Sequence, residues 1–311
     1  MRWVFKHLTL TVMQKEVVEF ISYLRHEKRS SNHTVVAYET DLNQFLKFLL
    51  ENYEVDNPVH ASHSIIRTWI VTLMESGLDP RSVNRKVTTL RTFYRYLVKS
   101  AYLERSPMLK VIAPKTRKKL PEYIDEKRME HLLESKAPDG AGFIQLRDFL
   151  ILDFFYRTGV RLSELIGLKV EDVNLYQLTV RVLGKRNKVR QIPITMAFKS
   201  MLELYLSERK IFMESRDTKH TFFFVDNRGN QMYPAFVYRI VRSHVSEVST
   251  GRKRSPHVLR HSFATAMLNN GADINAIKEI LGHSSLAATQ VYTHNSAEKL
   301  KEVYKQAFPK A

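Results

Sequence analysis

Apolar residues in the first hundred positions recur at the spacing of a helix face. One such face holds Tyr38, Leu42, Phe45, Leu46 and Leu49. A second begins at Ile65 and stops at Gly77, and a third opens at Pro80. Positions three and four apart share one side of a helix, so each run predicts an amphipathic helix packed on a common core. We therefore expect this part of the chain to be entirely helical.

The helix that Pro80 opens has one apolar side and one basic side. Its apolar side holds Val83, Val87, Leu90, Phe93, Tyr94 and Leu97. Its basic side holds Arg81, Arg85, Lys86, Arg91 and Arg95. This division suits a helix that packs on a core and faces phosphate, and it equally suits a basic face that meets only water.

The helical pattern breaks between residues 107 and 121. Prolines stand at 107, 114 and 121. A basic run lies among them: Lys115, Arg117, Lys118 and Lys119. Proline opposes helix continuation and charge opposes burial, so we predict an interdomain linker over residues 107–120. It would join a domain of residues 1–106 to one of residues 121–311, either lying along a DNA backbone or serving as a solvated tether.

The pattern beyond residue 121 predicts helices with a small β-sheet. Residues 146–156 suit a buried helix that runs into a Thr-Gly-Val-Arg segment ending at Arg161. Residues 178–183 and 189–194 alternate as the two strands of a hairpin, and residues 221–225 are a candidate further strand. The expected fold class is mainly α with a small sheet, α+β.

Three further helices are expected after residue 254, each with a recognisable start. Ser255 precedes a proline at the first helical position, and Asp273 can cap the next helix. Ser284 or Ser285 can cap the last, which carries Tyr292.

Composition and charge reduce the number of functional classes to which this protein can belong. The formal net charge is +17 and the isoelectric point is about 9.9. A folded protein this basic usually binds a polyanion, and nucleic acid is the first candidate. An anionic membrane surface would call for one basic amphipathic helix or a polybasic tail, whereas lysine and arginine are spread along the whole chain.

The chain has no cysteine. This excludes a disulfide framework, a thiolate zinc site and a cysteine nucleophile, and it fits a reducing cytoplasm. Lys6 and His7 interrupt the first apolar stretch, so we expect no signal peptide. The best interior apolar run, residues 149–155, is short and contains Asp153, so we expect no transmembrane helix.

Several basic residues have the chemistry needed to cleave a phosphodiester without a metal ion. That reaction requires a nucleophile, cations for the non-bridging oxygens and a proton donor for the leaving oxygen. Arginine is planar and always charged, which suits it to phosphate. Arg161 follows a Thr-Gly pair, and His257 and Arg260 lie three apart, so both project from one helix face.

A zinc helix is the competing interpretation of the same histidines. His257 and His261 have the spacing of a metalloprotease, but that motif needs a glutamate where this chain has Val258, and no third ligand is clear. We therefore expect no metal and no cofactor. Taken singly, His283 could be only a helix C-cap and Tyr292 only a core aromatic.

Four segments hold these residues in a distinctive order. They are Thr158-Gly159-Val160-Arg161-Leu162-Ser163-Glu164-Leu165, Gly184-Lys185-Arg186-Asn187-Lys188, His257-Val258-Leu259-Arg260-His261-Ser262-Phe263-Ala264-Thr265, and Leu281-Gly282-His283-Ser284-Ser285 leading to Tyr292-Thr293-His294. In order and spacing they resemble the tyrosine recombinase (phage integrase) family, in particular its Xer branch. The first hundred residues resemble that family's SAM-like four-helix core-binding domain. The resemblance implies a C-shaped clamp around DNA, closed by the tyrosine recombinase catalytic domain.

The resemblance also implies catalytic roles. Tyr292 would be the nucleophile that forms a 3′-phosphotyrosyl link, and Arg161 and Arg260 would clamp the scissile phosphate. Lys185, on the hairpin turn, would protonate the leaving 5′ oxygen. Lys188 is its rival within the sequence, but the family's lysine directly follows the hairpin glycine.

The resemblance also implies roles for two histidines, and the chain differs from the family's pattern at two positions. His257 would act as general acid–base and His283 would hydrogen-bond the phosphate. Ala266 stands where many relatives have a histidine, which puts local packing in doubt more than chemistry. The end of the chain resembles the His-Pro-Arg-Ala tail of Xer proteins, with Phe308 replacing the histidine.

The implied partner is a double-stranded DNA recombination site, bound by a homo- or hetero-tetramer with a second recombinase on two synapsed sites. A DNA translocase of the division machinery is the implied activator, and no membrane takes part. After Tyr292 a helix capped by Ser296 would present an apolar stripe of Leu300, Val303, Tyr304 and Ala307. That stripe would dock into a neighbouring protomer or fold onto its own domain.

The implied activity is site-specific DNA recombination, with chromosome dimer resolution at cell division as the expected role. A transposon or plasmid integrase uses the same chemistry and is the near alternative. A type IB topoisomerase and a non-catalytic DNA-binding protein are the distant ones.

Overall fold

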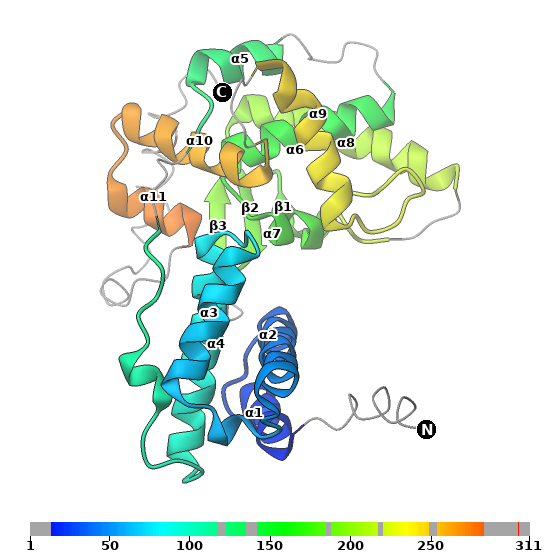
Figure 1. Ribbon diagram of the computed structural model, residues 1–311. Helices are drawn as coiled ribbons and strands as arrows, with labels where there is room; N and C mark the ends of the chain where they lie inside the picture. The colour runs from blue at the N-terminus through cyan, green and yellow to red at the C-terminus, as the bar shows by residue number, and fades with distance from the viewer. Residues whose placement is uncertain are drawn as a thin grey trace. The chain divides into compact units, whose positions relative to one another are not determined.

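The computed structural model describes residues 14–116, 122–134, 142–184, 188–216, 220–248, 254–282 and Tyr304, with the backbone alone for 247 and 248. The chain divides into two compact units, Met1–Lys119 and Leu120–Ala311 (Figure 1). Each unit has a separate hydrophobic core. We describe the two in turn.

The first unit is helical, as its apolar pattern predicts. It contains α1 (Lys15–His26), α2 (Asn32–Tyr53), α3 (His63–Glu75) and α4 (Pro80–Lys99), with short 3-10 turns η1 (Pro58–His60) and η2 (Pro107–Lys110). Side-chain oxygens of Ser31, Ser62 and Asp79 accept hydrogen bonds from the first-turn N–H groups of α2, α3 and α4. Such caps satisfy donors that a helix leaves unpaired at its start.

Part of the segment predicted as a linker is attached to α4. Met108 and Val111 are buried in the core of the first unit. The Asn84 side chain donates to the Pro114 carbonyl (2.9 Å), and the Arg91 guanidinium donates to the Val111 carbonyl (3.0 Å). The prolines end the helical pattern, but the non-helical segment that follows still places side chains in the core of the first unit. The boundaries of the domains and of the linker stay a prediction.

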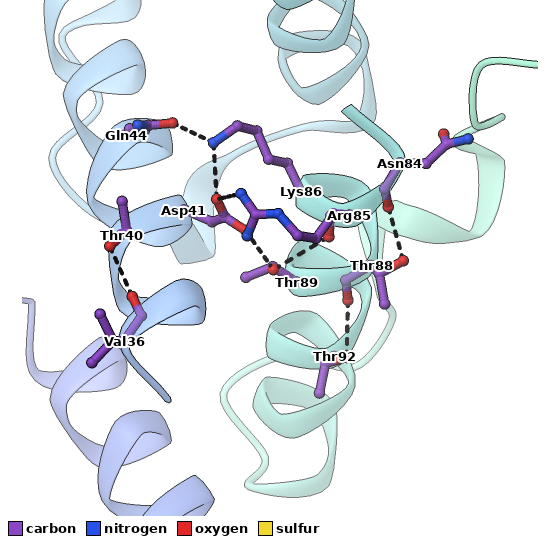
Figure 2. A network of polar contacts seen from close by, with 10 residues as sticks. All are labelled: Val36, Thr40, Asp41, Gln44, Asn84, Arg85, Lys86, Thr88, Thr89 and Thr92. Atoms are coloured by element: carbon purple, nitrogen blue, oxygen red, sulfur yellow. Dashed lines mark hydrogen bonds and ion pairs between the residues drawn. The ribbon is translucent and has the colours of Figure 1, made fainter. Parts of the chain in front are cut away.

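A buried carboxylate joins α2 to α4 (Figure 2). Asp41 has no exposed surface. It accepts hydrogen bonds from Arg85 Nη2, Lys86 Nζ and Thr89 Oγ1, each 2.8 Å long. Lys86 does not lie on the basic outer side of this helix, where the sequence pattern predicted it, because its side chain is only 7% exposed. Asp41 supplies the counter-charge that makes this burial tolerable, and Gln44 accepts a second bond from the same ammonium.

The second unit surrounds a central helix, α6 (Phe143–Thr158). Five of its apolar residues have no exposed surface: Leu150, Ile151, Leu152, Phe154 and Phe155. The helices around it are α5 (Glu126–Glu134), α7 (Leu162–Gly167), α8 (Met196–Glu214), α9 (Pro234–Val248), α10 (Pro256–Asn269) and α11 (Ile274–Leu281). Helices α8, α9 and α10 contact α6 directly. Nowhere in the described ranges is a helix long and apolar enough to cross a membrane.

A small antiparallel sheet lies in the same unit. The turn η3 (Val170–Asp172) leads into β1 (Val173–Asn174), which pairs with β2 (Thr179–Leu183), and β2 pairs with β3 (Val189–Pro193). The β2–β3 hairpin is confirmed, with Val182 opposite Arg190. The mainly α fold with a small sheet is therefore as expected.

One local expectation was wrong. Residues 221–225 form no strand and make only isolated bridges, one from Phe222 and one from Val225. Phe223 and Phe224 have no exposed surface, so this apolar run reflects burial and not sheet formation. Ser255 precedes the proline that begins α10, as expected, and its side chain makes no capping hydrogen bond.

We expect Asp41→Ala to destabilise the first unit by about 3–5 kcal/mol, because it leaves Lys86 buried without a counter-charge. Both tryptophans, Trp3 and Trp69, belong to the first 119 residues, so tryptophan fluorescence during denaturant unfolding reports on this unit. Asp56 is exposed in the same unit, and Asp56→Ala is the matched control. Equal unfolding midpoints for the two variants would contradict the account of the buried network.

Candidate active site

Two of the predicted arginines meet at the C-terminal end of α11. Arg260, from α10, donates from Nη2 to the Leu281 carbonyl (2.7 Å) and from Nη1 to the Gly159 carbonyl. Arg161, at the start of α7, donates from Nη2 to the Gly282 carbonyl (2.9 Å). The last carbonyls of a helix lack partners within it and carry its negative end, so cations are stabilised there. The fold thus brings together two cations that are 99 positions apart in the sequence.

The junction between α6 and α7 fits only glycine at position 159. Gly159 ends α6 with a φ of +59°, in the left-handed region. A Cβ atom there would lie 2.4 Å from the Phe263 ring. This close approach brings the Gly159 carbonyl to Arg260 and starts the turn that leads to Arg161.

Glu164 holds Arg161 in place. It accepts from Arg161 Nη1 (2.7 Å) and from the Arg161 backbone N–H (2.7 Å). Arg190, on β3, donates to both of its oxygens at 2.8 Å. Burial would raise the pKa of Glu164, but hydrogen bonds from Arg190 and from the Arg161 backbone outweigh it and lower the pKa to about 2. The carboxylate is therefore charged at neutral pH.

The cluster as a whole has more positive than negative charge. It contains the guanidinium groups of Arg161, Arg190 and Arg260 and the carboxylate of Glu164. Burial, and then the charge of Arg161, lowers the pKa of Arg260 to about 10, so it remains protonated at neutral pH. Buried cations in excess of their counter-charge are suited to bind an anion such as a phosphodiester.

The other predicted residues are placed less fully. His257 lies in the first turn of α10 and is exposed. Arg260 stands three residues further along the same helix and is buried. No described contact joins the two side chains. Lys185, His283 and Tyr292 lie outside the described residues. No group of three or more histidine, aspartate or glutamate side chains in the described part of the chain is arranged to hold a metal ion.

One residue of the segment after Tyr292 is described. Tyr304 is buried in the core of its own unit, and its hydroxyl donates to the Arg157 carbonyl (2.7 Å). At this position the apolar stripe packs within the chain. Leu300, Val303 and Ala307 lie outside the described residues, so docking of that segment into a neighbouring protomer stays a prediction.

Glu164 and Arg190 are site residues that were not predicted from the sequence. A signal was present for each. Glu164 stands three residues after Arg161, where a first-turn carboxylate can reach back to the start of a helix. Arg190 is a charged residue on the inward side of a strand, four positions from the apolar Ile194.

Comparison with known proteins places the chain in a family. Residues 122–299 match the family described as "Phage integrase family", and residues 17–101 match "Phage integrase, N-terminal SAM-like domain". Tyrosine recombinase XerC of Chlorobaculum parvum is 36% identical over 94% of both chains. Tyrosine recombinase XerD of Listeria monocytogenes is 33% identical over 96% of this chain and 100% of the relative.

Solved structures show the same fold. XerH recombinase bound to difH substrate, in a post-cleavage complex, has a TM-score of 0.67 and 21% identity over 93% of this chain and 84% of that one. The Tn1549 transposon integrase, in complex with transposon right end DNA, has a TM-score of 0.67 and 19% identity over 93% of this chain and 99% of that one. With two family matches, an arginine cluster and relatives similar over nearly their whole length, the chain belongs to the phage integrase family of tyrosine recombinases.

Proposed function

We propose that this recombinase cleaves and rejoins a specific DNA site through Tyr292, and that it resolves chromosome dimers at cell division. The observation that carries the proposal is the pair of guanidinium groups held at the end of α11, that of Arg161 partly exposed and that of Arg260 buried. The described bonds use two of the five N–H groups of each arginine. The remaining groups can bind a phosphate without breaking the contacts that orient the side chains.

The reaction needs only groups of this chain and the DNA. The Tyr292 oxygen attacks phosphorus and forms a 3′-phosphotyrosyl bond, while the bond to the 5′ oxygen breaks. Lys185 gives a proton to that oxygen, and His257 serves as the general acid–base group. Arg161, Arg260 and His283 bind the non-bridging oxygens as charge develops. Attack by a 5′ hydroxyl reverses the steps and rejoins the strand, so no external energy is required.

The cellular role rests on the relatives. The two relatives at 36% and 33% identity are an XerC and an XerD recombinase, and both are similar to this chain over nearly its whole length. The transposon integrase is similar at 19% identity, which concerns the fold alone, so the mobile-element alternative is not favoured. The proposed assembly is a tetramer on two synapsed DNA sites in the cytoplasm, alone or with a second recombinase, activated by a translocase of the division machinery.

We expect Tyr292→Phe to abolish the covalent protein–DNA product, because it removes only the attacking oxygen. Binding to DNA should persist within about threefold, since the arginines supply the phosphate contacts. A nicked suicide substrate followed on a denaturing gel measures the adduct, and a gel shift measures binding. An adduct formed by the variant would show that another residue is the nucleophile.

We expect Lys185→Ala to slow cleavage by about a hundredfold or more, because the leaving oxygen then departs without its proton donor. A substrate with sulfur at the 5′-bridging position needs little protonation and should recover most of that rate. Lys188→Ala, three residues along the same hairpin, is the control. Equal losses on the oxygen and sulfur substrates would remove Lys185 from the acid role.

The cellular role can be tested by incubation with fragmented DNA of the source genome. We expect the fragments left covalently bound to share one chromosomal sequence, because a dimer-resolving recombinase acts at a fixed site. Sequencing after denaturing capture identifies them, with Tyr292→Phe as the background control. Enrichment of the two ends of a mobile element would support the integrase alternative instead.

A further inference from the structure

Arg190 joins three elements of the candidate active site, although the sequence did not single it out. It lies on β3, with its side chain 11% exposed. Its guanidinium donates from Nε to the Ile280 carbonyl on α11 (2.6 Å) and from Nη1 and Nη2 to the two oxygens of Glu164 on α7. One side chain thus joins the hairpin, α7 and α11, three elements labelled in Figure 1.

This side chain lies against the backbone at two glycines, and only at Gly282 would a Cβ atom be crowded by it. A Cβ atom at Gly282 would lie 3.2 Å from Cδ and Nη1 of Arg190, and Gly282 has a φ of +63°. A Cβ atom at Gly184 would lie 3.5 Å from the same Nη1. Each glycine directly precedes a proposed catalytic residue, Lys185 in one case and His283 in the other. Arg190 therefore packs against the backbone from which both of those residues continue.

The charge of Arg190 has a separate effect on Arg161. Glu164 bonds both arginines, so Arg190 supplies one positive charge against the one carboxylate. Arg161 can then be oriented by Glu164 without losing the excess positive charge that a phosphate requires. If Glu164 had Arg161 as its only partner, the two would form a neutral pair.

We propose that Arg190 is a positioning residue for DNA cleavage, which places Arg161 through Glu164 and sets the backbone leading to Lys185 and to His283. The proposal rests on the proposed function, since it assumes cleavage by Tyr292. A lysine at this position keeps the charge but has one nitrogen in place of three, so it cannot bond both oxygens of Glu164 and the Ile280 carbonyl in the same geometry. The planar guanidinium is the part of the side chain that matters.

A surface ion pair of the same sheet provides the matched control. Arg181, on β2, bonds Asp172 at 2.8 and 2.9 Å, and its side chain is 54% exposed. No described side-chain hydrogen bond or ion pair joins it to Glu164 or to Arg161, Arg190 and Arg260. Arg190→Lys and Arg181→Lys therefore make the same chemical change at a buried junction and at an exposed pair.

The experiment compares single-turnover cleavage of suicide DNA at saturating protein by the wild type and both variants, together with DNA affinity and thermal unfolding. We expect Arg190→Lys to fold, to bind DNA within about threefold of the wild type, and to cleave at least about thirtyfold more slowly, since a misplacement of about 1 Å can cost a hundredfold. Arg181→Lys should cleave within about twofold. The 5′-bridging sulfur substrate should recover only part of the Arg190→Lys defect, because the contribution of Arg161 remains impaired.

Three results would overturn the proposal. Wild-type cleavage by folded Arg190→Lys would show that charge alone suffices. A loss of rate matched by an equal loss of affinity would assign Arg190 to binding. If Arg190→Lys does not fold, the double variant Glu164→Gln/Arg190→Gln removes the buried charges together, and wild-type cleavage by it would show that Arg190 only neutralises Glu164. Failure of the wild type to form a Tyr292 adduct would contradict the proposed function instead.

Discussion

Three guanidinium groups, one buried and two partly buried, donate hydrogen bonds to the end of α11, and these bonds organise the catalytic unit. Arg190, Arg260 and Arg161 donate to the carbonyls of three successive residues, 280, 281 and 282. These carbonyls would otherwise be unpaired at the C-terminus of a helix. Because the arginines come from β3, α10 and the start of α7, the site exists only when these elements have come together at the end of α11.

A cluster of like charges is costly to bury, and the fold offsets that cost locally. Glu164 is the one carboxylate among the three arginines described above, and its low pKa keeps it ionised. The carbonyls around Arg260 supply partial negative charge but no full counter-ion. The cluster therefore retains excess positive charge in a partly dry environment, where an arriving phosphate is attracted more strongly than it would be at a wet surface. The excess positive charge favours phosphate binding but lowers the stability of the fold. The large apolar core of this unit supplies the stability.

Much of the fold could be predicted because periodicity reports directly on single elements. The faces of α2, α3 and α4 and the β2–β3 hairpin follow from spacing alone. What spacing misses is pairing across elements. Lys86 looks solvent-facing until Asp41, 45 residues earlier, is known to lie against it. Arg190 looks like an ordinary strand residue until Glu164 and Ile280 are brought beside it.

The same limit applies to the site. From the order of the motifs we expect Arg161 and Arg260 to lie close together. The structure brings both to the end of α11, where Arg260 also bonds the Gly159 carbonyl. The predicted roles of Lys185, His283 and Tyr292 depend on residues outside the described ranges, so they remain proposals. Arg190 and Glu164 each have only a weak local signal in the sequence, and their importance lies in contacts that form in the folded chain.

The arginines are held largely by main-chain oxygens, and this has a consequence for how the protein can vary over evolutionary time. Ile280 and Leu281 contribute their carbonyls to the cluster, and every residue type has that group. Drift among similarly sized apolar side chains there leaves the acceptors in place. Gly159 and Gly282 have no such freedom, because both have positive φ and both lie against a neighbouring side chain. Sequence change near the arginine cluster is thus restricted mainly by chain geometry at two glycines and by the four charged side chains, while the residues between them are free to follow the packing of the core.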